Sequence, residues 1–99
     1  MRPILVGDVL VLARALLAVP APDREGFAAR LITETEQADR HRQATGRAHP
    51  VWGDGSVMCR ALMAIPTTRP SVSRLDQIAA IAVAADCLCR FALADARRE

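Results

Sequence analysis

Residues 39–56, DRHRQATGRAHPVWGDGS, hold the densest group of side chains that could do chemistry. Both histidines, three arginines and the lone tryptophan fall in this segment: Arg40, His41, Arg42, Arg47, His49 and Trp52. The basic groups could contact phosphates while the indole stacks on a base, which makes the segment a candidate interaction site. The alternative is a solvated helix end and a loop whose tryptophan packs beneath it, because Asp39 and Asp54 dilute the positive charge. No nucleic-acid-binding signature decides between the two readings.

Two further arginines occupy the same place in a repeated pattern. GDVLVLARALLAVP (7–20) aligns without a gap with GDGSVMCRALMAIP (53–66), and the alignment pairs Arg14 with Arg60. A guanidinium in an apolar helix needs a carboxylate or carbonyl partner, since burying an unpaired charge costs much free energy. Arg14 and Arg60 are therefore a candidate pair of anion- or partner-binding residues, or else arginines that extend to solvent or cap a neighbouring helix.

Groups suited to catalysis or metal binding do not assemble in the sequence. The available soft ligands are His41, His49, Cys59, Cys87 and Cys89. Their spacing matches no zinc motif, and no base is placed beside a serine or cysteine nucleophile. The GDG of 53–55 lacks the lysine and the preceding strand of a phosphate-binding loop. We expect no catalytic residues, no metal, no cofactor and no enzymatic activity.

The composition indicates one all-α domain over residues 1–99. The chain is 52% hydrophobic, mostly Ala, Leu and Val, and only 3% aromatic. Small aliphatic side chains without strict alternation favour closely packed helices over a β-sandwich. The net charge of +2, with arginine and no lysine, does not by itself imply nucleic-acid binding.

Cysteine usage and the N-terminal segment bear on the compartment. Three cysteines, two of them in a C-x-C pattern on an expected helix, do not resemble a disulfide framework. The N-terminal apolar run is interrupted by Asp8 and Arg14, is too short to span a bilayer, and recurs at 53–66. We therefore expect a reduced, soluble, cytoplasmic protein with no membrane partner.

Capping and breaking residues predict four helices. Their expected bounds are Val9–Val19, Pro22–Ala44, Val57–Ala64 and Arg74–Ala96. The expected N-terminal caps are Asp8, Ser56 and a capping box of Ser73 with Asp76, and the expected stops are Pro20, Gly46 and Pro66. A short helix followed by a long one occurs twice, in hairpins 7–44 and 57–96 joined by the Gly/Pro/Trp loop 45–56. This order predicts a four-helix bundle-like domain, whose halves are related by internal duplication or are alike by coincidence.

The last expected helix carries more apolar surface than one neighbour can cover. One stripe consists of Leu75, Ile78, Ala82, Ala85, Cys89 and Ala92, and an adjacent one of Ile81, Ala84, Leu88 and Phe91. The helix is therefore either central in the domain or part of an oligomer interface.

The segment DRHRQATGRAHPVWGDGSVM, together with the opening MRPILVGDV, resembles a small family of proteobacterial proteins catalogued as a domain of unknown function. The resemblance covers most of the chain. It implies a short, stand-alone cytoplasmic protein and transfers no catalytic or ligand-binding residue.

These observations favour a non-enzymatic helical module that binds another protein or, more specifically, forms homo-oligomers. The alternative is a nucleic-acid-associated adaptor of the phage DNA-packaging type, which would use the arginine patch from Arg40 to Arg47. A third hypothesis, an enzyme or small-molecule binder, requires His41, His49 and Trp52 to converge on a pocket.

Overall fold

A computed structural model describes residues 2–67 and 71–98. The described residues form helix α1 (Val6–Leu16), a short 3-10 helix η1 (Ala21–Asp23), and helices α2 (Arg24–Thr45), α3 (Val57–Ala64) and α4 (Arg74–Arg98). Within these ranges no strand is present, and one isolated bridge joins His49 to Gly53. The predicted all-α, bundle-like fold is confirmed.

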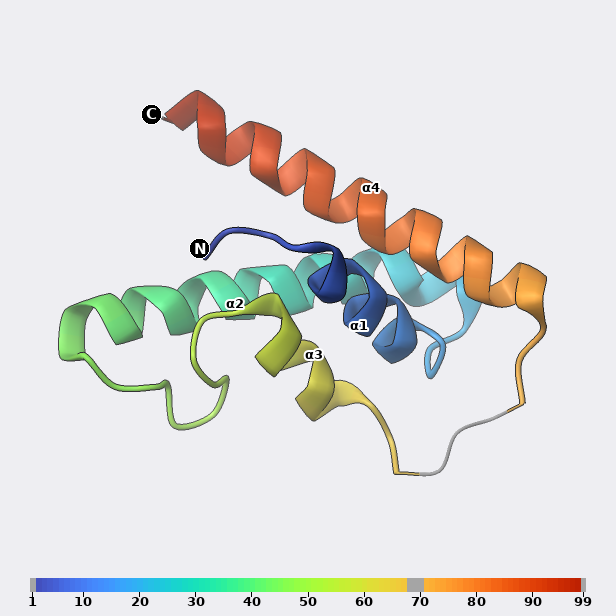
Figure 1. The fold of residues 1–99 in the computed structure, drawn as a ribbon, viewed down its shortest axis with the longest axis horizontal. Helices are drawn as coiled ribbons and strands as arrows, with labels where there is room; N and C mark the ends of the chain where they lie inside the picture. Colours follow the sequence, from blue (N-terminus) through green and yellow to red (C-terminus); the bar gives the residue numbers. More distant parts are fainter. Residues whose placement is uncertain (1, 68–70, 99) are drawn as a thin grey trace.

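Helix α1 lies mainly against α4, the long helix of the other hairpin, whereas α3 lies mainly against α1 and to a smaller extent against α2 (Figure 1). Helix α1 packs most extensively on α4 and next on α3, whereas its contact with α2 is small. Helix α2 contacts α4 and α3. The two hairpins are therefore interleaved, and neither buries its own apolar surface by itself.

Small and branched aliphatic side chains fill the core between these helices. The largest fully buried apolar side chains are Leu12 and Leu16 of α1 and Leu31 of α2. Around them the helices meet through alanines, including Ala28 of α2 and Ala84 of α4. Alanine lets helix axes approach closely, so a 99-residue chain almost without aromatic residues can still form a dense interior.

The start of α1 differs from the prediction. The helix begins at Val6 and ends at Leu16, about one turn earlier than the predicted Val9–Val19. Asp8 is not its N-cap but lies in its first turn, where the carboxylate accepts a hydrogen bond from the amide of Leu5 (2.7 Å). Its other oxygen accepts from the amide of Met58 (3.0 Å), in the first turn of α3. The buried Asp8 therefore satisfies free amides at two helix N-termini.

The remaining predicted helix ends agree more closely with the structure. Helix α3 has the predicted bounds, and the hydroxyl of Ser56 accepts from the amide of Cys59 (3.1 Å) as an N-cap. Helix α2 ends at Thr45, one residue beyond the predicted Ala44, and its C-cap is the predicted Gly46, which has a left-handed φ of 72°. At the start of α4, Ser73 accepts from the amide of Asp76, but the Asp76 carboxylate is directed elsewhere.

The repeated pattern is used differently in its two copies. Asp8 lies inside α1, whereas the aligned Asp54 lies before α3 and accepts from the amide and hydroxyl of Ser56 (2.9 and 2.7 Å). The two short helices thus begin at different positions of the aligned sequence. An internal duplication stays a prediction, since the repeat shares its letters but not its helix start.

Candidate functional site

The loop between α2 and α3 is held in a tight turn by His49. The Nδ1 atom of His49 accepts hydrogen bonds from the amides of Val51 (3.0 Å) and Trp52 (3.1 Å). The backbones of His49 and Gly53 are joined by two hydrogen bonds of 2.7 and 3.2 Å. One nitrogen of this imidazole is therefore committed to local structure as an acceptor.

The aromatic side chains of the candidate segment form one cluster. Trp52 stacks on His49 with ring centroids 4.8 Å apart and planes inclined by 12°. The edge of His41, on α2, meets the His49 ring at 5.1 Å. Trp52 is half-buried and lies outside the main core, and one face of its indole is covered by His49.

Two glycines let this loop approach its neighbours. Gly53 and Gly55 have φ values of 88° and 91°, a region that side chains other than glycine rarely adopt. A Cβ atom at Gly55 would lie 2.7 Å from the Cα atom of Asp39, and one at Gly53 would lie 2.5 Å from Sγ of Cys59. The loop is therefore pressed onto α2 and α3 at these two points.

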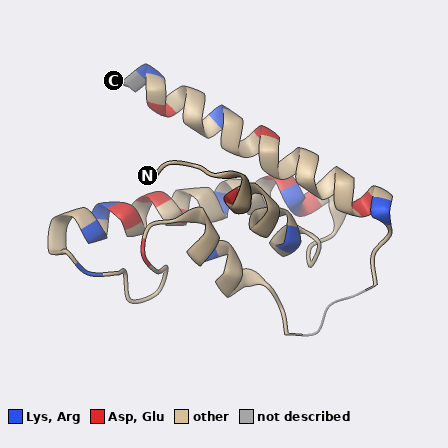
Figure 2. Ribbon diagram, viewed as in Figure 1, with Lys and Arg blue, Asp and Glu red and all other residues tan. Residues whose placement is uncertain are grey.

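The arginines of the segment do not join the aromatic cluster in a common cavity. Arg40 lies 3.7 Å from Glu36 in the preceding turn of α2, while Arg42 and Arg47 are exposed. Figure 2 shows the basic positions spread over α1, α2 and α4. Nearby, the hydrogen bond from the Ser56 hydroxyl lowers the pKa of Asp54, and the Arg2 guanidinium at 3.4 Å acts in the same direction. The structure thus brings together His41, His49 and Trp52 but leaves the arginines dispersed.

The two arginines of the repeat have unlike surroundings. Arg60 of α3 donates through Nε and Nη2 to Oε1 of Glu34 on α2, at 2.9 and 2.7 Å, and both side chains are largely buried. Arg14 of α1 is exposed and forms no ion pair with any residue that the structure describes. The two arginines that the repeat pairs therefore have different surroundings: Arg60 joins two helices, and Arg14 faces outward.

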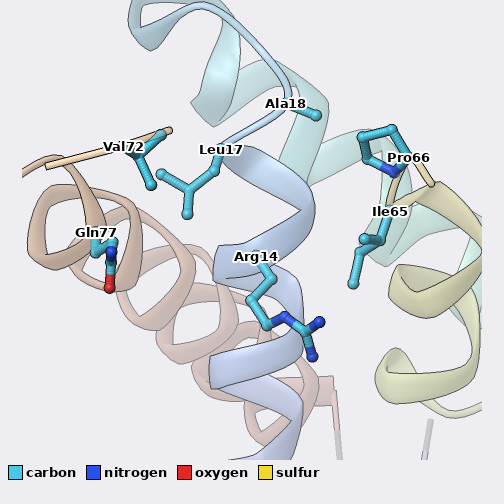
Figure 3. Close-up of a pocket in the computed structure, with 7 residues that line it drawn as sticks. All are labelled: Arg14, Leu17, Ala18, Ile65, Pro66, Val72 and Gln77. Atoms are coloured by element: carbon cyan, nitrogen blue, oxygen red, sulfur yellow. The ribbon is translucent and has the colours of Figure 1, made fainter. Parts of the chain in front are cut away.

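Arg14 lies at the edge of a mostly apolar groove of about 250 Å³ (Figure 3). The groove is lined by Arg14, Leu17, Ala18, Ile65, Pro66, Val72 and Gln77, from the ends of α1 and α3 and the start of α4. In Figure 3 the Arg14 guanidinium extends past α1 on the side of Ile65, away from Val72 and Gln77. The other polar residue of the lining, Gln77, lies on the opposite side of the groove from the Arg14 guanidinium.

A third arginine, which the sequence did not single out, has the most complete set of partners. Arg24, at the start of α2, is 6% exposed and donates from Nε to the carbonyls of Leu16 and Val19 (both 3.0 Å). Its Nη1 and Nη2 atoms donate to the two carboxylate oxygens of Asp76 at 2.9 and 3.2 Å. Arg24 thereby caps the end of α1 and attaches the start of α4, and this hydrogen bond lowers the pKa of Asp76.

One apolar side of α4 is buried and the other is exposed. The inner side of the helix packs into the core through Ala80, Ala84 and Leu88. The other stripe is exposed along its whole length: Leu75, Ile78, Ala82, Ala85, Cys89, Ala92 and Ala96. Leu75 is 76% exposed and Ile78 62%. We call these seven residues the outer stripe; because no described element covers it, α4 is peripheral rather than central in the domain.

Helix α4 also meets a length and composition criterion for membrane spans. Among the described residues, Arg74–Arg97 is the one segment apolar and long enough to cross a bilayer, with a mean hydropathy of 1.6 in an 18-residue window. Core helices of soluble proteins pass the same test. Here one side of the helix is in the core, and Arg90 pairs with Asp86 (2.6 Å) and with Glu25 of α2 (2.8 Å) in its C-terminal half.

Metal-ligating and nucleophilic side chains are scattered. Within the described ranges no group of three His, Cys, Asp or Glu residues is placed to hold a metal ion. Cys59, Cys87 and Cys89 are free thiols, and burial raises the pKa of Cys87. A raised thiol pKa disfavours the nucleophilic thiolate, so Cys87 is suited to packing rather than to reaction.

Residues 2–88 match a family described as "Domain of unknown function (DUF7742)". No curated protein gives a significant match to the chain, and no protein of solved structure does.

Proposed function

The chain belongs to the DUF7742 family, a domain of unknown function, and we propose that it is a non-enzymatic interaction module that associates with copies of itself. The observation that carries this proposal is the outer stripe of α4. Large contiguous apolar surfaces on small proteins mark sites of association. This stripe is apolar for six turns and contains no charged residue.

The spacing of the stripe favours a helical partner. Its residues follow one another at intervals of three, four, three, four, three and four positions, which is the heptad repeat of helix pairs. Helix α4 has 25 residues and is therefore about 37 Å long, enough for three heptads of contact. A flat peptide or a small ligand would not require this periodicity.

The order of side-chain sizes along the stripe supports a second copy of this chain as the partner. The stripe has bulky side chains at its N-terminal end and smaller ones at its centre and C-terminal end, so one copy of α4 can complement another, as described below. Closed two-fold dimers are the commonest assemblies formed by a single kind of chain. A second copy is thus the simplest occupant, and it needs no partner of different sequence.

The arginine-rich segment supports the nucleic-acid alternative less well. The His49 ring stacks on Trp52 and makes a T-shaped contact with His41. Its Nδ1 atom accepts a hydrogen bond within the turn. The exposed Arg42 and Arg47 remain available, but the indole of Trp52, which would stack on a base, is half-buried and already stacks on His49.

A charge placed in the stripe tests the proposal. We expect the unmodified protein to be a dimer by size-exclusion chromatography with light scattering at micromolar concentration. The substitution Ala85→Glu should shift it to a monomer, because two carboxylates would be buried at the contact. Circular dichroism should show an unchanged fold, since Ala85 is exposed within the single chain.

Ala94→Glu provides the matched control. Ala94 is also exposed and on α4, but nine positions from Ala85, which is about two and a half turns, so it lies on the opposite side of the helix. This variant should remain dimeric. A protein that is monomeric without substitution, that stays dimeric with Ala85→Glu, or that binds lipid vesicles through α4 instead of dimerising would contradict the proposal.

A further inference from the structure

The order of side-chain sizes along the outer stripe bears on how two copies of α4 meet. The bulky residues Leu75 and Ile78 lie at the N-terminal end, the small Ala82 and Ala85 at the centre, and smaller residues again towards the C-terminus. Two helices that cross at an angle are closest at the crossing point, where only small side chains fit. A crossing point at Ala82 and Ala85, near the middle of the helix, brings the bulky end of each copy against the small end of the other.

We infer that the two copies of α4 pair antiparallel, related by a two-fold axis beside Ala82 and Ala85; this inference rests on the proposed self-association. In antiparallel pairs each core layer combines an a position with a d position of the other helix. The layers are then Leu75 with Ala92, Ile78 with Cys89, and Ala82 with Ala85, each occurring twice. Every bulky side chain meets a smaller one.

The parallel arrangement lacks this complementarity. It would set Leu75 against the partner's Leu75 at one end and Ala92 against the partner's Ala92 at the other. The helices would be forced apart at the first end and left with a gap at the second, and gaps in an apolar contact lose dispersion and transfer energy.

The charges beside the stripe favour the same direction. Arg74 and Asp95 lie on the same flank, one at each end of the contact. Antiparallel pairing places Arg74 across from the partner's Asp95, whereas parallel pairing leaves these two residues at opposite ends of the contact, where they cannot meet. The antiparallel arrangement also brings helix ends of opposite dipole sign together.

Cys89 gives a direct measure of the arrangement. It is the exposed cysteine of the chain, whereas Cys87 is buried and Cys59 half-buried. In the antiparallel pair the two Cys89 residues are eleven positions apart along the contact, roughly 16 Å, which exceeds the span of a disulfide. In a parallel pair they would face each other directly.

The experiment is oxidative cross-linking of the full chain, with disulfides assigned by mass spectrometry and the dimer population measured in parallel by sedimentation. Without substitution, oxidation should give no covalent dimer through Cys89. The variant Ile78→Cys should give a dimer linked between positions 78 and 89, and Ile78→Cys with Cys89→Ser should lose that link.

The outcomes separate the two proposals. A Cys89–Cys89 disulfide in the unmodified protein, or a sedimenting Ile78→Cys dimer without the 78–89 link, would overturn the antiparallel register while leaving self-association intact. A protein that sediments as a monomer would overturn both.

Discussion

Helix α4 has two apolar sides with similar periodicity but opposite surroundings. On the inner side Leu88 is 2% exposed among residues of α1 and α2, while on the outer side Leu93 is 55% exposed beside the outer stripe. The contrast shows that hydrophobic periodicity indicates which side of a helix needs cover, but not whether the cover comes from the same chain. The short helices show the same contrast, because Arg60 of α3 is largely buried against Glu34 while Arg14 of α1 is exposed.

The largest effect is expected from truncating a matched pair of leucines on α4. Leu88→Ala should lower the free energy of unfolding by about 2–5 kcal/mol, because it leaves a cavity in the core. Leu93→Ala should change it by no more than about 0.5 kcal/mol. Urea unfolding followed by circular dichroism, with both changes made in the Ala85→Glu background, removes any contribution from self-association. Equal losses would mean that the two sides of α4 are not different.

A smaller effect is expected where α4 is attached at its start. Arg24→Met removes charge-assisted hydrogen bonds to the carbonyls of Leu16 and Val19 and to the Asp76 carboxylate. We expect a loss of roughly 1.5–3 kcal/mol in the free energy of unfolding. Arg30→Met, an exposed position of the same helix, is the control and should stay near the unmodified value. A neutral Arg24→Met would show that Arg24 does not hold these helices together.

Replacing the two arginines of the repeat should change the free energy of unfolding by unequal amounts, with a still smaller difference between them. Arg60→Met leaves the largely buried Glu34 without its closest partner and should cost about 1 kcal/mol, whereas Arg14→Met should be nearly neutral. A double-mutant cycle with Glu34→Gln measures the coupling of Arg60 to Glu34. A coupling of zero would remove the structural distinction between the two arginines.

The smallest effect is a change in acid stability. The folded-state pKa of Asp76 is lowered from its ordinary value of 3.8, chiefly by the hydrogen bond from Arg24. A lowered carboxyl pKa contributes stability that is present above 3.8 and is lost as the pH falls through the lowered pKa. Asp76→Asn should therefore flatten the acid limb of a stability–pH curve. Some slope should remain, because the pKa of Asp54 is lowered as well; an unchanged acid limb would contradict this role of Asp76.

The sequence predicted those features that depend on local signals. Ser56 with the following apolar turn fixes the start of α3, and Gly46 fixes the end of α2, because each acts on backbone groups next to it. The width of the apolar surface on α4 was likewise readable from spacing alone. These signals need no knowledge of distant contacts.

Features that depend on distant partners could not be read in this way. Asp8 is a residue type common at helix N-caps, but its carboxylate also accepts a hydrogen bond from the amide of Met58, fifty positions away in the chain. Arg24 resembles any charged residue in a first helical turn until α1 and α4 bring its partners to it. His49 offers a ring that could bind phosphate, yet the fold uses its Nδ1 atom to close a turn.

Sedimentation equilibrium of the unmodified protein is the most direct test of whether α4 joins two copies of the chain. Over a series from low to high micromolar concentration, we expect the apparent mass to rise from the 10.7 kDa of one chain towards twice that value. The Ala85→Glu variant should remain at the mass of one chain throughout. A mass of 10.7 kDa for the unmodified protein at every concentration would contradict self-association through the outer stripe.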